Sequence, residues 1–166
     1  MENLLKFIIV LACASFLSSC TTEVKLNSKS QSAPQKTPYD SIRANEFGAD
    51  AYGMKKYVMA FLKQGPNRDF SEEVAKELQK GHMAHIVKMA EDGKLVLAGP
   101  FLGDGDLRGI FVFNVSTIEE AEALTSADPA IQAGSLNMEL IEWYGSAALM
   151  GVNEVHQTIS KKGITD

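Results

Sequence analysis

Two histidines three residues apart, His82 and His85, are the side chains of this sequence best suited to proton transfer near neutral pH. An unperturbed imidazole has a pKa of about 6.5, so small changes in its surroundings make it a usable base or acid at pH 7. Both histidines fall on the apolar face of a predicted helix. A histidine there is either a hydrogen-bonded core residue or a proton-transfer group in a pocket, and the residues leave both interpretations open.

The helix that must position these histidines is predicted to run up to the turn at Asp92-Gly93, because apolar residues recur along it every three or four positions. Asp69 or Ser71 would cap its N-terminus, and two glutamates follow in the first turn, where anions are favoured. The stripe consists of Val74, Leu78, His82, Ile86 and Met89, with His85 inside it. The turn Asp92-Gly93 then leads into a short strand that stops at Gly99-Pro100.

Four strand-like segments and two helices alternate along the domain. The strands are predicted at residues 56–62 (apolar on both faces), 94–98, 108–115 and 136–144. The second helix begins at a capping box, either Ser116 with Glu119 or Thr117 with Glu120, and ends near Ala127. The order β-α-β-β-α-β predicts an α+β, ferredoxin-like fold. Helices would cover one face of the sheet, so a second copy of the sheet could cover the other, which predicts a homodimer.

The N-terminal residues have the pattern of an export signal. An apolar run at residues 7–17 is too short to span a bilayer, and the LSSC sequence that ends at Cys20 resembles the lipobox of bacterial lipoproteins. The resemblance implies a signal peptide at residues 1–19 and acylation of Cys20, hence a domain held at a membrane of the bacterial cell envelope, outside the cytoplasm. Residues 20–53 are predicted to be a flexible linker, 54–145 the folded domain and 146–166 a moderately helical tail without a predicted place.

Charge and cysteine content exclude other classes of protein. The net charge is -5, and there is no basic cluster, so nucleic acid is not an expected partner. Cys13 and Cys20 are the two cysteines of the chain. The first lies in the predicted signal peptide and the second would be acylated, which excludes thiol chemistry in the mature protein.

Several segments together resemble the YCII-related family. They are KYVMAFLKQGPN, GHMAHIVKMAEDGKLVLAGPF, GDLRGIFVFNV, SADPAIQAG and MELIEWYG, in the family's order over about residues 55–145. The resemblance implies a dimeric α/β barrel and an active site made of a helical His and an Asp in an Asp-Pro turn. These positions fall on His82 and Asp128, whereas His85 stands where relatives often have an aromatic residue. The implied reaction is cofactor-independent proton transfer on a small cyclic or aromatic molecule, of the isomerase or dehydrochlorinase type.

Each candidate also has a simpler interpretation. Asp128 could orient His82, as the acid of a catalytic triad does, or cap a helix that begins at Pro129. The two histidines could share a metal with Asp128 or Glu139 as third ligand, but pocket lining without a metal is the preferred interpretation.

The remaining pocket candidates are His85, Gly99, Pro100, Phe101 and Arg108. Arg108 could orient an anionic substrate or pair with Asp104 or Asp106. The sequence therefore predicts a small-molecule enzyme with a His82–Asp128 acid/base pair. A non-enzymatic ligand-binding module and a dimerisation module are the alternatives.

Overall fold

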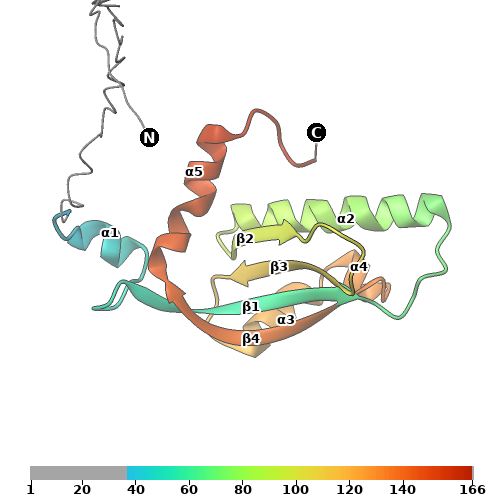
Figure 1. Ribbon diagram of the computed structural model, residues 1–166, viewed down its shortest axis with the longest axis horizontal. Helices are drawn as coiled ribbons and strands as arrows, with labels where there is room; N and C mark the ends of the chain where they lie inside the picture. Colours follow the sequence, from blue (N-terminus) through green and yellow to red (C-terminus); the bar gives the residue numbers. More distant parts are fainter. Residues whose placement is uncertain (1–36, 166) are drawn as a thin grey trace, which may run out of the picture. The chain divides into compact units, whose positions relative to one another are not determined.

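A four-stranded antiparallel sheet forms the centre of the fold in the computed structural model, which describes residues 37–165 (Figure 1). Its strands are β1 (Met54–Gln64), β2 (Leu95–Pro100), β3 (Leu107–Phe113) and β4 (Leu136–Ser146), in the order β2-β3-β1-β4. Helix α2 (Glu72–Glu91) joins β1 to β2, and α3 (Ile118–Thr125) with the short α4 (Pro129–Gln132) joins β3 to β4. This connection order, with β1 and β3 in the middle of the sheet, confirms the predicted α+β, ferredoxin-like fold.

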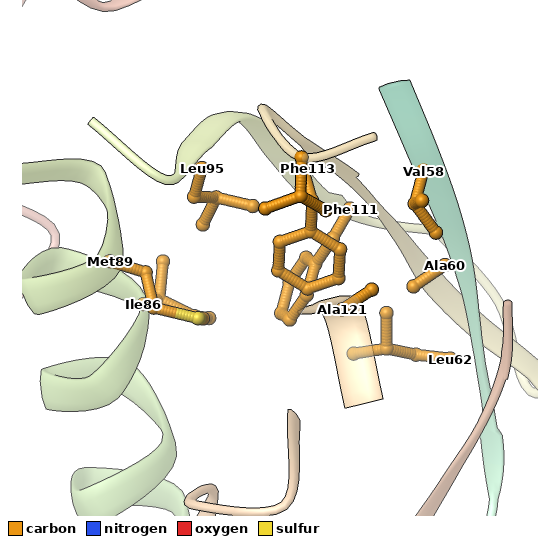
Figure 2. Close-up of a cluster of buried hydrophobic side chains, with 10 residues drawn as sticks. Val58, Ala60, Leu62, Ile86, Met89, Leu95, Phe111, Phe113 and Ala121 are labelled. Carbon is orange, nitrogen blue, oxygen red and sulfur yellow. The ribbon is translucent and has the colours of Figure 1, made fainter. Parts of the chain in front are cut away.

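The main core lies between one face of the sheet and the helices (Figure 2). Alternate residues of β1 point to this side, and Phe111 and Phe113 of β3 pack edge to face beside them, with ring centroids 5.7 Å apart. Helix α2 contributes Ile86 and Met89, both at most 9% exposed. Burying a side chain of this size contributes about 1.5–3 kcal/mol, so these contacts hold α2 firmly against the sheet. The cluster also contains Val58, Ala60, Leu62, Leu95, Val115 and Ala121.

The other face of the sheet is only partly covered within the described residues. A smaller cluster there contains Tyr57, Val96 and Val112, and the 3₁₀ turn Ala147–Gly151 packs Leu149 and Met150 against it. The tail that the sequence left without a place therefore covers one end of this face. Helix α5 (Val152–Ile159) follows, and Asn153 Nδ2 donates to the carbonyl of Leu95 on the edge strand at 2.8 Å.

The elements differ from the predictions in several places. The first strand alternates between buried and half-buried side chains at its C-terminal half, so it is not buried on both faces throughout. The second strand runs through Gly99-Pro100 because the ladder with β3 continues to Pro100. A short helix, α1 (Ser41–Glu46), capped by Asp40, lies in the segment expected to be flexible linker.

The predicted signal peptide and the acylation site at Cys20 lie outside the described residues. Within residues 37–165, no helix is long and apolar enough to cross a membrane.

Candidate active site

A buried hydrogen bond joins the two residues that the family resemblance singles out. His82 Nδ1 lies 2.7 Å from Asp128 Oδ2. His82 is 6% exposed and Asp128 is fully buried. The distance is that of a charge-assisted hydrogen bond and lies in the range needed for acid/base chemistry.

Two helices place this pair. Ser71 caps α2, with its hydroxyl accepting from the amide of Val74, and the regular helix carries His82 to the middle of its buried side. Asp128 is the N-cap of α4, followed by Pro129 at the first helical position. Asp128 Oδ1 accepts from the amide of Ala130 at 2.8 Å, which leaves Oδ2 for the imidazole. The capping interpretation and the orienting interpretation of Asp128 are therefore both realised, one on each oxygen.

Gly81 lets the two helices approach at this point. A Cβ atom at Gly81 would lie 3.0 Å from Cγ of Pro129, tighter than ordinary van der Waals contact. Since Gly81 precedes His82 and Pro129 follows Asp128, this close approach lies directly beside the pair.

The environment of Asp128 determines the tautomer of His82. Burial opposes ionisation of the carboxyl group, but hydrogen bonds from His82 and Ala130, with the charge of His82 and a smaller contribution from His85, hold the pKa of Asp128 below its usual value. The carboxylate therefore only accepts, and His82 Nδ1 must donate its proton to it. In the neutral ring the other nitrogen, Nε2, is then an unprotonated acceptor.

His82 Nε2 faces a cavity. The ring stacks on Phe111, with centroids 6.0 Å apart and planes at 19°, and it lines a cavity of about 520 Å³ between α2 and the sheet. Nε2 has no hydrogen-bond partner among the described residues. Every fully buried side-chain nitrogen or oxygen of these residues does have a hydrogen-bond partner, so Nε2 is not one of the fully buried atoms. Nε2 is therefore accessible from the cavity, whose volume suits a small organic molecule.

Four of the predicted pocket residues line this cavity: Gly99, Pro100, Phe101 and Arg108. His85 does not line it, because its Nε2 lies 2.9 Å from the carbonyl oxygen of Leu124 and holds α2 to α3. The structure therefore does not place His85 in the pocket, contrary to the prediction. Arg108 forms no ion pair with Asp104 or Asp106; its Nη1 donates to the carbonyl of Gly105 at 3.2 Å.

Several lining residues were not predicted from the sequence, among them Arg68 in the β1–α2 loop and Ile164 in the C-terminal tail. Nothing in the local sequence marks Ile164. The Gly-Pro-Asn sequence directly before Arg68 marks a loop, but it does not indicate that Arg68 reaches the cavity. A larger hollow of about 700 Å³ between α2, β2 and the tail contains neither His82 nor Asp128.

The residues considered as metal ligands do not converge. Glu139 forms an ion pair with Lys63, both side chains being partly exposed, and His85 is bonded to α3. Within residues 37–165 no three His, Cys, Asp or Glu side chains are grouped so that they could hold a metal ion.

The fold and the site together define a ferredoxin-like domain with a buried His–Asp pair that opens into a cavity. The chain belongs to the YCII-related domain family, whose model matches residues 57–144. A similar solved structure is 5-chloro-2-hydroxyhydroquinone dehydrochlorinase (TftG) from Burkholderia phenoliruptrix AC1100, in complex with 2,5-dihydroxybenzoquinone. It is 20% identical, has a TM-score of 0.40, and the match covers 52% of this chain and 92% of that one. No curated protein matches the chain.

Proposed function

We propose that the protein is a cofactor-independent enzyme that moves a proton on a small cyclic or aromatic molecule. The observation that carries the proposal is the geometry of His82, whose Nδ1 is bonded to a buried carboxylate while Nε2 faces a cavity of about 520 Å³. A core histidine without function has no need of an unprotonated nitrogen beside an open cavity. Membership of the YCII-related family is consistent with this chemistry.

The step that this arrangement supports is general base catalysis. Neutral His82 accepts the proton of a substrate C–H bond at Nε2, and the electron pair of that bond forms a new π bond in the substrate. In a lyase a leaving group, such as chloride, departs with its own bonding pair; in an isomerase His82 returns the proton at another atom. The Asp128 carboxylate stabilises the imidazolium formed in either case. In the lyase the ring then releases its proton to water, and in the isomerase to the substrate, which restores the neutral base.

Hydrogen–deuterium exchange tests the step even when the product has not been identified. Cyclic 1,3-diketones and chlorinated hydroxyquinols are incubated with the full-length protein in D₂O, and the loss of C–H signals is followed by NMR. We expect enzyme-dependent exchange or elimination that falls at least about 100-fold in His82→Gln, the usual scale for loss of a general base. His85→Gln is the matched control, since His85 lies on the same helix but outside the cavity.

The outcomes separate the enzyme from a binding module. Equal rates in His82→Gln and wild type would refute the assignment of the base. Ligand binding at the cavity without exchange or elimination for any compound would favour the non-enzymatic alternative.

We also propose that the protein is a homodimer that uses the uncovered face of the sheet. Trp143 and Ile141 of β4 remain 36% and 45% exposed on this face, and Trp143 lies 5.8 Å from the ring of Tyr57. An apolar sheet face of this kind is usually covered in a stable protein. Light scattering on the full-length protein should give twice the mass of one chain, and light scattering on the Trp143→Glu variant should give the mass of a single chain. A monomeric wild type at micromolar concentration would contradict the proposal.

Attachment to the bacterial envelope is proposed from the N-terminal sequence alone. The resemblance of LSSC to a lipobox supports cleavage before Cys20 and acylation of its thiol and amino groups. Mass spectrometry of the protein made in a bacterium should show the loss of residues 1–19 and the added acyl mass, both missing in Cys20→Ser. An unmodified Cys20 would refute the anchor and leave the site proposal unaffected.

A further inference from the structure

The cavity beside His82 has a charge opposite to that of the whole chain. The chain carries 21 acidic and 16 basic side chains, a net charge of -5. Among the described residues that line the cavity there is no Asp or Glu, but there are two arginines, Arg68 and Arg108. Asp128 adds one negative charge behind the His82 ring, so the two arginines and this carboxylate together sum to one positive charge while the imidazole is neutral.

Neither guanidinium is neutralised by a carboxylate. Arg68 Nη1 donates to the carbonyl of Ser135 at 3.1 Å, and Arg108 Nη1 donates to the carbonyl of Gly105 at 3.2 Å. These are the hydrogen bonds of the two side chains within the described residues, and neither forms an ion pair there. A guanidinium has five N–H donors, so each keeps several donors for a ligand. One backbone bond to each also limits the orientations of the two side chains.

The loop that carries Arg68 is itself fixed in place. Its backbone bonds to the turn after α4, through Gly65 N to the carbonyl of Ser135 at 2.9 Å and Asn67 N to that of Gly134 at 3.0 Å. Asn67 Nδ2 adds a bond to the carbonyl of Ala133 at 2.8 Å. A Cβ atom at Gly65 would lie 2.1 Å from the oxygen of Gly134, so only glycine permits this contact. Arg68 therefore stands at the cavity because two loops are joined, although its side chain is exposed.

We propose that the cavity selects a small organic anion, with a carboxylate or phenolate oxygen held by Arg68 and Arg108 and an apolar body facing Phe101, Phe111 and Ile164. Planar guanidinium groups suit such oxygens because they can donate two parallel hydrogen bonds. The inference rests on the proposed function for the identity of the site, and it adds the class of substrate and two specificity-determining residues. A cationic wall also stabilises the negative charge that develops on a substrate when His82 removes a proton.

Benzoate and benzamide test the charge preference, because they have nearly the same shape and differ in charge. Each is titrated into the full-length protein, and binding is followed by NMR shifts of cavity residues. We expect benzoate to bind at least about 10-fold more tightly than benzamide at low ionic strength, with the preference falling as salt is added. Arg68→Gln and Arg108→Gln should each reduce it several-fold, and the double variant should abolish it. Arg43→Gln, in α1 and away from the cavity, is the control with the same change of charge.

The result that overturns the inference is an equal affinity for the two compounds, or no binding of either, in a wild-type protein whose His82 ring retains its bond to Asp128. A benzoate preference that survives the double arginine variant also overturns it. His82→Gln separates the two proposals. If the His82→Gln variant keeps the benzoate preference and also the wild-type rate of hydrogen–deuterium exchange, the anion site stands and the proposed base fails. If exchange depends on His82 but benzoate shows no preference, the base stands and the anion site fails.

Discussion

Replacing Asp128 with asparagine separates the two tasks of its side chain, because the two oxygens have different partners. Oδ1 accepts from the amide of Ala130 at 2.8 Å and Oδ2 accepts from His82 at 2.7 Å. Asparagine offers one acceptor and one donor group. The backbone amide of Ala130 can only donate, so the asparagine oxygen must stay there and its NH₂ must face His82. The imidazole then has to accept at Nδ1 and carry its proton on Nε2, where it can no longer act as a base.

The expected cost in stability follows from the same contacts. In Asp128→Asn a charge-assisted hydrogen bond becomes a neutral one, which costs about 1–2 kcal/mol, while the cap of α4 is kept. In Asp128→Ala both bonds are lost, about 1 kcal/mol for the cap and about 1.5–3 kcal/mol for the bond to His82. A domain of this size has roughly 5–15 kcal/mol of stability, so both variants should remain folded.

The pH dependence has a definite sign. Because the pKa of Asp128 is lower in the folded protein than its usual value of 3.8, its contribution to stability is present above pH 3.8 and disappears as pH falls through the folded-state pKa. The difference in unfolding free energy between wild type and Asp128→Asn should therefore shrink as the pH falls below about 3.8.

Nitrogen-15 NMR of the His82 ring and urea unfolding measure both effects. Wild type should show a protonated Nδ1 and a free Nε2, and Asp128→Asn the reverse. Exchange activity should fall by a factor of about 10⁴ in the variant if the tautomer controls the base, as it does in triads. The reasoning is refuted if the two proteins have the same tautomer, or if their stability difference is independent of pH down to the acid transition.

Three further substitutions test the fold around the site. Burial raises the pKa of Tyr57 to about 12, so wild-type stability should fall as pH rises from about 10 to 12. Tyr57→Phe should remove this fall, as measured by urea unfolding at alkaline pH. The variant should also lose about 1 kcal/mol of stability at pH 7, because the hydrogen bond to the carbonyl of Ser146 is gone. Gly81→Ala should lack the usual gain of about 1 kcal/mol for a helix, because the new methyl group meets Pro129, and it should shift the His82 ring signals. Thr117→Ala removes the capping box of α3 and should cost about 1 kcal/mol by thermal unfolding.

Much of the fold was predictable because local signals agree with the tertiary structure. The sequence offered two possible N-caps for each helix, and the structure shows that Ser71 rather than Asp69 caps α2 and that Thr117 rather than Ser116 caps α3. The alternating apolar residues of β4 and the C-terminal half of the α2 stripe, Ile86 and Met89, face the same core, whereas Val74 at the start of the stripe is 46% exposed. The places of α1 and α5 were not predictable, because short amphipathic helices are held by contacts that local sequence does not encode.

The site was predictable only in part, and the two histidines show why. Helical spacing put His82 and His85 in one stripe, yet residues three apart lie roughly 60° apart around a helix axis. That angle is enough to direct His82 to Asp128 and the cavity, and His85 to the carbonyl of Leu124 on α3. Periodicity distinguishes a buried face from an exposed one, but it does not say which neighbouring element each buried polar group meets.

The short helix α4 connects the proton-transfer pair to the cationic loop, and this connection explains how a small domain can combine the two. Its N-cap, Asp128, holds the imidazole of His82. The turn that follows its last residue, from Ala133 to Ser135, accepts the hydrogen bonds that fix Asn67 and Arg68. A shift of α4 would therefore displace the base and one of the charges together. The spacing between His82 and Arg68 is consequently set by α4 and its turn, whereas Arg108 is placed by β3 of the sheet.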